Sequence, residues 1–187
     1  PNTKVFNLGI TTNDFDKKIK KFYYTDDDNT NFSMIDSVQG NILSYSWIVP
    51  NIVTDSARIW INTYDIVGLT SSDTSSIFSI TDGIPPEIIV LTPSIGTSVR
   101  EYSDLAVTWF ANDNIALDSI EIFYSNNGGI DFNLVGKVGG ENNEYYFVIP
   151  MGVTDSAQVK LIASDIYGNE SQDLSIYFSV TDFTLPI

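Results

Sequence analysis

The chain carries one sequence pattern twice, and this internal repeat constrains its fold more than any other feature. The pentapeptide VTDSA occurs at residues 53–57 and again at 153–157, 100 residues apart. Shifted by the same 100 residues, segment 5–86 matches segment 105–186 without an insertion or deletion. Self-similarity at a fixed spacing indicates a tandem array of one structural unit. The sequence therefore predicts two copies of one domain.

The repeat divides the chain into three segments. Residues 1–83 contain the first copy and residues 84–182 contain the second. Residues 183–187 begin a linker, because TDFTLPI at the end of the chain repeats the TDGIPPE that leads into the second copy. The two prolines of that linker fix φ and favour extended backbone, so we expect it to limit bending.

Each copy consists of short runs that alternate apolar and polar residues, with turn-forming residues between them. This pattern is typical of half-buried strands. In the second copy it predicts strand A at 87–92, B at 105–111, C at 119–125, C′ at 132–138, E at 144–150, F at 157–164 and G at 174–180. VTDSA then forms the turn from E into F. Seven short strands in one repeat predict an all-β chain of two tandem two-sheet sandwiches.

Several strings along the strands resemble one group of known repeats. These are PPEIIVLTP, VTWFANDN, IEIFYSNNGG, YYFVIP, AQVKLIASDIYGN and IYFSVTD. Together they resemble the fibronectin type III and immunoglobulin-like repeats of large bacterial or archaeal secreted and cell-surface proteins. The resemblance implies a stalk, spacer, adhesive segment or accessory domain, and it brings no catalytic residues with it. One departure is Gly9, which the gapless alignment places opposite Trp109.

The two copies start at different points of the repeat. The first begins at Val5, the counterpart of Leu105 in strand B, so we expect its sandwich to lack strand A within this chain. Two explanations remain open. The chain is a piece of a longer array cut out of register, or a neighbouring chain supplies the strand, as in donor-strand complementation.

Composition excludes several classes of function. The chain has no histidine and no cysteine, which excludes zinc sites built on those ligands, thiol chemistry and Ser-His-Asp triads. Its 24 acidic and 9 basic residues give a formal net charge of −15, so we expect no nucleic-acid partner. Its longest apolar runs, such as residues 88–91, are far shorter than a membrane helix requires. We therefore expect no membrane insertion and no enzymatic activity.

Acidic residues cluster in loops that the strand order brings toward the linker. Calcium binds six to eight oxygen ligands. We therefore hypothesise a calcium site built from Asp27, Asp28, Asp82 and Asp113. The alternative is that these side chains cap turns and remain solvated. The pairs Asp65 with Gly68 and Asp165 with Gly168 fit turn chemistry better than metal ligation.

Two further features have both a structural and a functional interpretation. The basic run KKIKK at residues 17–21 would guard an exposed sheet face or edge, or it would dock against acidic loops of a neighbouring chain. Asn31 and Asn169 begin sequons in predicted loops and would accept N-linked glycan.

These features predict a non-catalytic structural or adhesive segment of an extracellular, cell-surface tandem-repeat protein, such as a stalk, sheath or filament. Its partners would be neighbouring repeats or chains of the same protein, together with glycans or a cell surface. The alternative function is an accessory substrate- or carbohydrate-binding module of a secreted enzyme.

Overall fold

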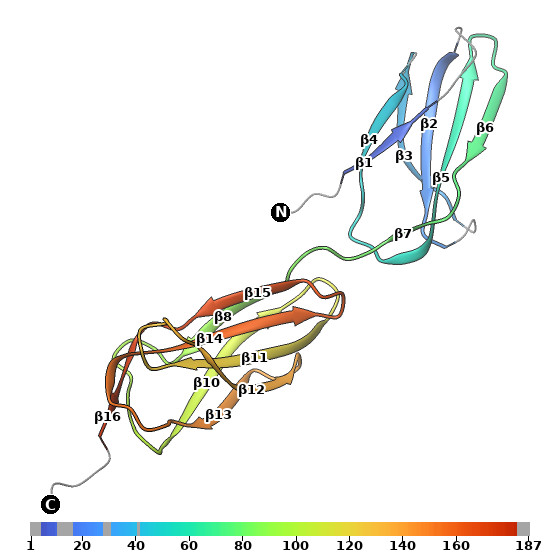
Figure 1. Ribbon diagram of the computed structural model, residues 1–187. Coiled ribbons are helices and arrows are strands. Elements are labelled where there is room, and N and C mark those ends of the chain that lie inside the picture. The colour runs from blue at the N-terminus through green and yellow to red at the C-terminus, as the bar shows by residue number, and fades with distance from the viewer. Residues whose placement is uncertain (1–4, 11–16, 28–30, 41, 183–187) are drawn as a thin grey trace, which may run out of the picture. The chain divides into compact units, whose positions relative to one another are not determined.

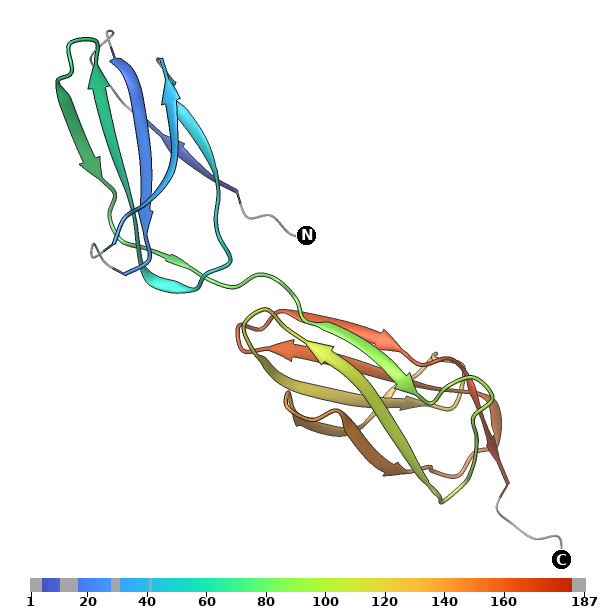
Figure 2. The same cartoon turned by 180° about the vertical axis from the view of Figure 1, so that it is seen from behind.

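The computed structural model describes residues 5–10, 17–27, 31–40 and 42–182 (Figures 1 and 2). The chain divides into two compact units, Pro1–Asp82 and Gly83–Ile187. All regular elements in the described ranges are strands, which agrees with the predicted all-β class. No described segment forms a helix long and apolar enough to cross a membrane.

The second unit is a sandwich of two sheets. Its strands are β8 (Glu87–Thr92), β9 (Ser98–Arg100), β10 (Asp104–Asn112), β11 (Leu117–Ser125), β12 (Asn133–Gly139), β13 (Glu144–Val148), β14 (Thr154–Asp165), β15 (Glu170–Leu174) and β16 (Phe178–Thr181). One sheet has the order β13-β10-β8, and the other has the order β12-β11-β14-β16-β9, with β15 also paired to β14. This is the A-B-E against C′-C-F-G arrangement of fibronectin type III and immunoglobulin-like sandwiches, so the predicted fold class is confirmed.

Two differences from the prediction in this unit go beyond the bounds of a strand. Strand G is split into β15 and β16, because the Ser175 hydroxyl accepts the Val159 amide at 2.9 Å and the chain bends after it. The three-residue strand β9 was not predicted. It pairs with β16 in parallel, whereas every other strand pair is antiparallel.

The interpretation of VTDSA as a turn was wrong, because Thr54 and Thr154 are the first residues of long strands. A register shift between Thr154 and Ala157 breaks the regular pairing with β16. Within this irregular stretch the Thr154 hydroxyl accepts the Ser156 amide at 3.1 Å. Small polar residues at a strand bulge therefore resemble the composition of a turn.

The first unit repeats this topology with fewer strands. They are β1 (Val5–Gly9), β2 (Lys17–Thr25), β3 (Ser33–Gln39), β4 (Ser44–Ile48), β5 (Thr54–Asp65), β6 (Thr70–Thr74) and β7 (Phe78–Ile80). One sheet has the order β3-β2-β5-β6, with β7 also paired to β5. In the described part of this unit, β1 pairs with β4 alone, and no strand takes the place of β8 or β9. The predicted absence of strand A is thus confirmed for the described residues.

The alignment of β1 with β10 was wrong by one residue. Phe6 pairs with Trp47, whereas Leu105 pairs with Phe147. The amide of Ile10 donates to the Leu43 carbonyl, as the amide of Trp109 donates to the Asn143 carbonyl. Ile10, rather than Gly9, is therefore the counterpart of Trp109.

The shift has a simple cause in the apolar pattern of β1. Phe6, Leu8 and Ile10 alternate on even positions, whereas Leu105, Val107 and Trp109 alternate on odd ones. A one-residue slip would move every side chain to the other face of the sheet. The register therefore follows the apolar residues, and the segment between Ile10 and Lys17 is one residue shorter than its counterpart.

The corrected register makes a testable prediction about β1. Leu8 is 8% exposed and packs in the core, whereas Asn7 is exposed. Leu8→Ala is expected to destabilise the first unit by about 2–5 kcal/mol. Asn7→Ala is expected to change its stability by less than about 0.5 kcal/mol. Urea unfolding of both variants measures the difference, and equal effects, or a larger effect at Asn7, would contradict the register.

Each unit has its own core, and the first core contains a lysine. Among the described residues, fifteen hydrophobic side chains are buried in the core of the second unit and six in the core of the first. Lys20 of β2 is 1% exposed, at the position that Ile120 occupies in the second unit. Its ammonium donates to the Ile42 carbonyl.

The interpretation of KKIKK as an exposed or docking run is therefore wrong for Lys20. This residue shares its parity with Phe22, which is fully buried, and a strand places alternate residues on one face. Lys21, on the other face, lies with its ammonium 5.1 Å from the centroid of the Tyr64 ring.

Candidate metal centre

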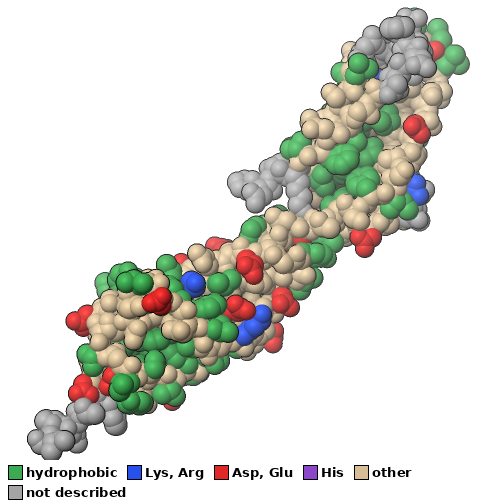
Figure 3. Space-filling model, viewed as in Figure 1, with side chains coloured by type: hydrophobic (Ala, Val, Ile, Leu, Met, Phe, Trp, Pro, Cys, Tyr) green, Lys and Arg blue, Asp and Glu red, His purple; other side chains and the backbone are tan. Residues whose placement is uncertain are grey.

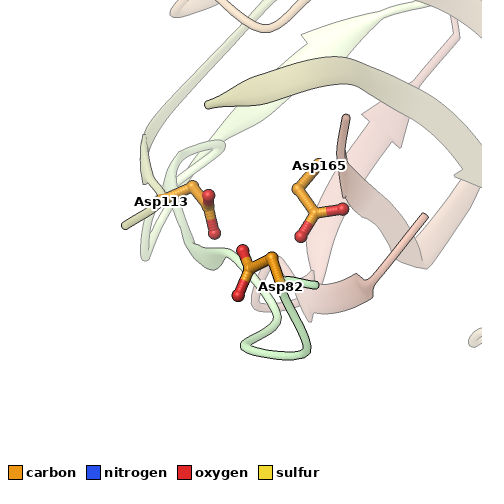
Figure 4. A group of neighbouring side chains, drawn as sticks. All are labelled: Asp82, Asp113 and Asp165. Carbon is orange, nitrogen blue, oxygen red and sulfur yellow. The ribbon is translucent and has the colours of Figure 1, made fainter. Parts of the chain in front are cut away.

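The carboxylates of Asp82, Asp113 and Asp165 form one group (Figure 4). Asp113 follows β10 directly, Asp165 is the last residue of β14, and Asp82 lies in the segment that leads toward β8. Carboxylate oxygens of the three residues lie within 4.8 Å of one another, and Figure 4 shows the carboxylates turned toward a common centre. Asp82 is 7% exposed and Asp165 is 3% exposed.

Strand pairing brings Asp113 and Asp165 together. Leu117, the first residue of β11, pairs with Asp165. Asp113 lies four residues before Leu117, in the turn that joins β10 to β11. The end of β14 and the start of β11 therefore place the two side chains at the same end of the sandwich.

Asp113 has one oxygen that serves the turn and one that does not. Its Oδ2 accepts the amides of Ile115 at 2.8 Å and Ala116 at 3.0 Å. Its Oδ1 is buried and has no hydrogen-bond partner. A buried carboxylate oxygen without a donor is costly unless a cation or another donor satisfies it.

Asp165 is held by the turn that follows β14. Its Oδ1 accepts the amides of Tyr167 and Asn169 at 2.8 Å, and its Oδ2 accepts the Asn169 side-chain amide at 2.7 Å. Gly168 closes this turn with φ of 82°, a conformation that favours glycine. The expected turn chemistry of Asp165 and Gly168 is thus present.

These hydrogen bonds also set the charge of Asp165. Burial raises the pKa of the carboxyl, but the hydrogen bonds from Asn169, Tyr167 and Gly168 outweigh it, and the pKa lies below its ordinary value. The carboxylate is therefore ionised at neutral pH. Its contribution to stability is present above the ordinary carboxyl pKa and is lost as the pH falls through the lowered one.

The donor set fits a hard divalent cation such as calcium. All donors are oxygens, and ligands on opposite sides of an ion at about 2.4 Å lie about 4.8 Å apart. Three carboxylates provide only part of the six to eight ligands that calcium takes, so carbonyl groups or water would complete the shell. Carboxylates at this spacing repel one another, and a bound cation would relieve the repulsion.

The sequence hypothesis named two of these three residues. Asp82 and Asp113 are in the group, and Asp165 was missed because its turn role explained it. The predicted strand order could have identified Asp165, because it places the loop after strand B, which contains Asp113, and the loop after strand F, which contains Asp165, at the same end of the sandwich.

The other two residues of the hypothesis have different settings. Asp27 lies in the loop after β2, where its carboxylate accepts the Thr25 hydroxyl and both the backbone and side-chain amides of Asn31. Its counterpart Asn127 accepts the Asp131 amide in the same way. This pattern indicates that Asp27 organises its own loop. Asp28 lies outside the described residues.

The two sequon asparagines have side chains that are already hydrogen bonded. Asn31 is exposed, and its side-chain amide donates to Asp27 at 3.0 Å. Asn169 is half-buried, and its side-chain amide donates to Asp165. A glycan on either nitrogen would have to accommodate or replace that bond, so glycosylation stays a prediction.

Comparisons with known proteins show similarity in structure alone. No protein-family model matches the chain, and no curated protein sequence matches it. The fibronectin(III)-like modules of Clostridium thermocellum CbhA are 14% identical, with 99% of this chain and 90% of that chain covered and a TM-score of 0.49.

Two other solved structures have lower TM-scores. A marsupial T cell receptor is 8% identical, covering 95% of this chain and 67% of its own, with a TM-score of 0.46. A tetra-tandem repeat from the extending region of a large adhesion protein is 16% identical, covering 95% of this chain and 45% of its own, with a TM-score of 0.36. The sandwich assignment rests on the strand order and pairing of the chain itself.

Proposed function

We propose that this chain is a non-catalytic structural or adhesive segment of an extracellular tandem-repeat protein, built into a cell-surface stalk, sheath or filament. The observation that carries the proposal is the parallel pair β9 and β16 in the second unit. Ser98 lies opposite Ser179, and Arg100 lies opposite Thr181. The amide of Ser179 donates to the Thr97 carbonyl at 3.2 Å, and the amide of Glu101 donates to the Thr181 carbonyl at 3.1 Å.

This pair suits a module that carries tension along its chain. β9 belongs to the segment that enters the second unit, and β16 is the last strand before the chain leaves it. Tension pulls the entering strand toward its N-terminus and the leaving strand toward its C-terminus. Because the strands are parallel, these forces run in opposite directions along the pair and load its hydrogen bonds together in shear.

A repeat in tandem is the second support for the proposal. Each unit buries a core of its own, and the strands of the first unit follow the topology of their counterparts in the second, so the chain repeats one module. The partners we propose are neighbouring repeats or chains of the same protein.

Carbohydrate binding by an accessory module is the alternative, and a groove in the first unit is where it would occur. The groove is lined by Tyr24, Met34, Ile35, Tyr45, Ser46, Trp47, Ile48 and Pro50. Figure 3 shows hydrophobic side chains gathered over β1 and β3 of this unit. Aromatic rings in a groove can stack on sugars, but Tyr24 packs on Trp47 with a centroid distance of 5.1 Å, as core rings do.

A glycan array and sedimentation at several protein concentrations separate the two functions. The structural proposal expects no reproducible glycan binding above background. It also expects the chain to associate as its concentration rises. Reproducible binding of one glycan class that substitution of the exposed groove residue Met34 by alanine abolishes, with the melting temperature retained, would replace the structural proposal by the accessory-module alternative.

We also propose that Asp82, Asp113 and Asp165 bind calcium. The unpartnered, buried Oδ1 of Asp113 supports this, together with the ionised and buried Asp165 beside it.

Asp113→Asn tests the calcium site without removing the turn. The amide oxygen can still accept the amides of Ile115 and Ala116, while an NH₂ group replaces the unpartnered oxygen. Without calcium we expect the variant to be at least as stable as the parent chain, because a donor now faces two carboxylates. With calcium at about 100 times its Kd, the parent gains about 2.7 kcal/mol and the variant gains almost none.

Calorimetric titration and thermal melting with and without calcium measure both effects. The control is Asp104→Asn, which removes an exposed carboxylate from β10 and should leave calcium binding unchanged. A parent chain that binds no calcium and keeps its melting temperature would contradict the proposed site.

A further inference from the structure

The edge of β7 in the first unit corresponds to a paired edge in the second. In the second unit β16 pairs with β14 on one side and with β9 on the other. In the first unit β7 pairs with β5, and no strand in the described ranges lies along its other side. The backbone direction of β7 is that of β16, so its outward amide and carbonyl groups face the position that β9 would take.

In the second unit the segment around β9 covers more than one strand edge. Beyond its ladder with β16, the amide of Tyr102 donates to the Ile149 carbonyl at 2.8 Å, and the amide of Ile149 donates to the Ser103 carbonyl at 2.9 Å. Val99 packs against the core. Residues 97–103, which include the strand β9 and the turn at residues 101–103, therefore close the gap between β16 and the residue that follows β13.

The corresponding residues of the first unit are left exposed. Leu105 is 5% exposed, whereas its counterpart by strand pairing, Phe6, is 41% exposed. Phe178 is 3% exposed, whereas Phe78 is half-buried and stacks on Phe6 with a centroid distance of 5.4 Å. Ile149 is fully buried, whereas Val49 is half-buried. Apolar surface that the second unit covers is thus open in the first.

We propose that the edge of β7, with Phe6 and Val49 beside it, is an acceptor site for an extended peptide segment of the chemistry of residues 97–103. The segment adds a parallel strand to β7 and places one apolar side chain, as Val99 does, over Phe6 and Phe78. This is strand addition, in which main-chain hydrogen bonds give affinity and alternate side chains give specificity.

The position of the occupant along the chain follows from the second unit. Only residues 101–103 separate β9 from β10. A segment that fills the acceptor in the same way is therefore joined directly in front of β1. One contact will not be reproduced: the Glu101 carboxylate accepts the Gly152 amide, whereas the Ile52 amide already donates to the Pro50 carbonyl.

A chain extended at its N-terminus tests the proposal. A second copy of residues 83–104 is joined directly to Phe6, which is the counterpart of Leu105. We expect the melting temperature of the first unit to rise by at least about 5 °C, because each kcal/mol shifts a domain of this size by about 4–8 °C. The matched control carries aspartate in place of valine at the added copy of Val99, and it should lose most of the gain.

Amide exchange on the unextended chain gives a second, independent measurement. Ser179 donates its amide to the carbonyl of Thr97, the residue directly before β9, so we expect it to exchange at least about tenfold more slowly than Ser79, its counterpart in β7. In the extended chain Ser79 should become protected. Equal protection of Ser79 and Ser179 in the unextended chain would overturn the proposal, as would an extended chain in which neither the melting temperature nor the exchange of Ser79 changes.

Discussion

Replacing Trp109 with alanine is expected to lower the melting temperature of the second unit strongly while that of the first unit stays unchanged. Trp109 is 2% exposed, packs in the core of the second unit and donates its indole N–H to the Asn142 carbonyl at 3.1 Å. Truncating a buried tryptophan costs about 3–5 kcal/mol. Domains of this size have about 5–15 kcal/mol of stability in total, so the loss is a large fraction of the stability of the second unit.

Thermal melting followed by residue-specific NMR measures the outcome of Trp109→Ala. The control is Phe110→Ala, the next residue of β10, whose side chain is 48% exposed and whose loss should cost less than about 1 kcal/mol. If the signals of both units disappear together at a lower temperature, the two cores do not fold independently.

Replacing Lys20 with alanine is the second change with a large expected effect, and it acts on the first unit. The aliphatic part of Lys20 fills the place that Ile120 fills in the second core, and its ammonium satisfies the Ile42 carbonyl. Alanine leaves a cavity and an unsatisfied buried carbonyl. Both costs together should destabilise the first unit by about 2–4 kcal/mol.

Lys21→Ala provides the matched control for Lys20→Ala. The two lysines are neighbours of equal charge in β2, but Lys21 is half-buried against the ring of Tyr64. Its removal should cost at most about 1 kcal/mol. Urea unfolding compares the two variants. Equal losses would show that Lys20 does not reach the core, and the sequence interpretation of the run as an exposed one would then stand.

The strand prediction succeeded where the alternation of apolar residues was strong. β8 has the predicted bounds, 87–92, and β10 and β11 differ from the prediction by one or two residues at their ends. The prediction missed β9 because Ser98–Arg100 is too short to show a period. It placed β1 one residue off because the two copies were aligned without a gap. The register is instead set by the apolar side chains at the even positions Phe6, Leu8 and Ile10.

The candidate site could be predicted in part. The acidic loops and the strand order placed Asp113 near the linker, and Asp82 followed from the repeat. Asp165 was set aside because a turn explained its carboxylate, although one carboxylate can serve both a turn and a cation. The burial of each oxygen, on which the argument for Asp113 depends, is a property of packing that no sequence pattern reports.

The burial of Lys20 also could not be predicted from the charge pattern. Charge pattern favoured an exposed run at residues 17–21, whereas strand parity placed Lys20 on the face of Phe22. The alternation of the strand decides the position of Lys20, because a register that exposed Lys20 to solvent would also expose Phe22 and turn every side chain of β2 to the other face.

Single-molecule stretching of the chain between its ends tests the central claim most directly. A tension-bearing tandem repeat predicts two separate unfolding events, which release about 25 nm and about 30 nm of extended chain for the first and second units. The second unit should unfold at the higher force, because its β9–β16 pair is loaded in shear. A single event, or extension without a force peak for the second unit, would contradict the proposed mechanical role.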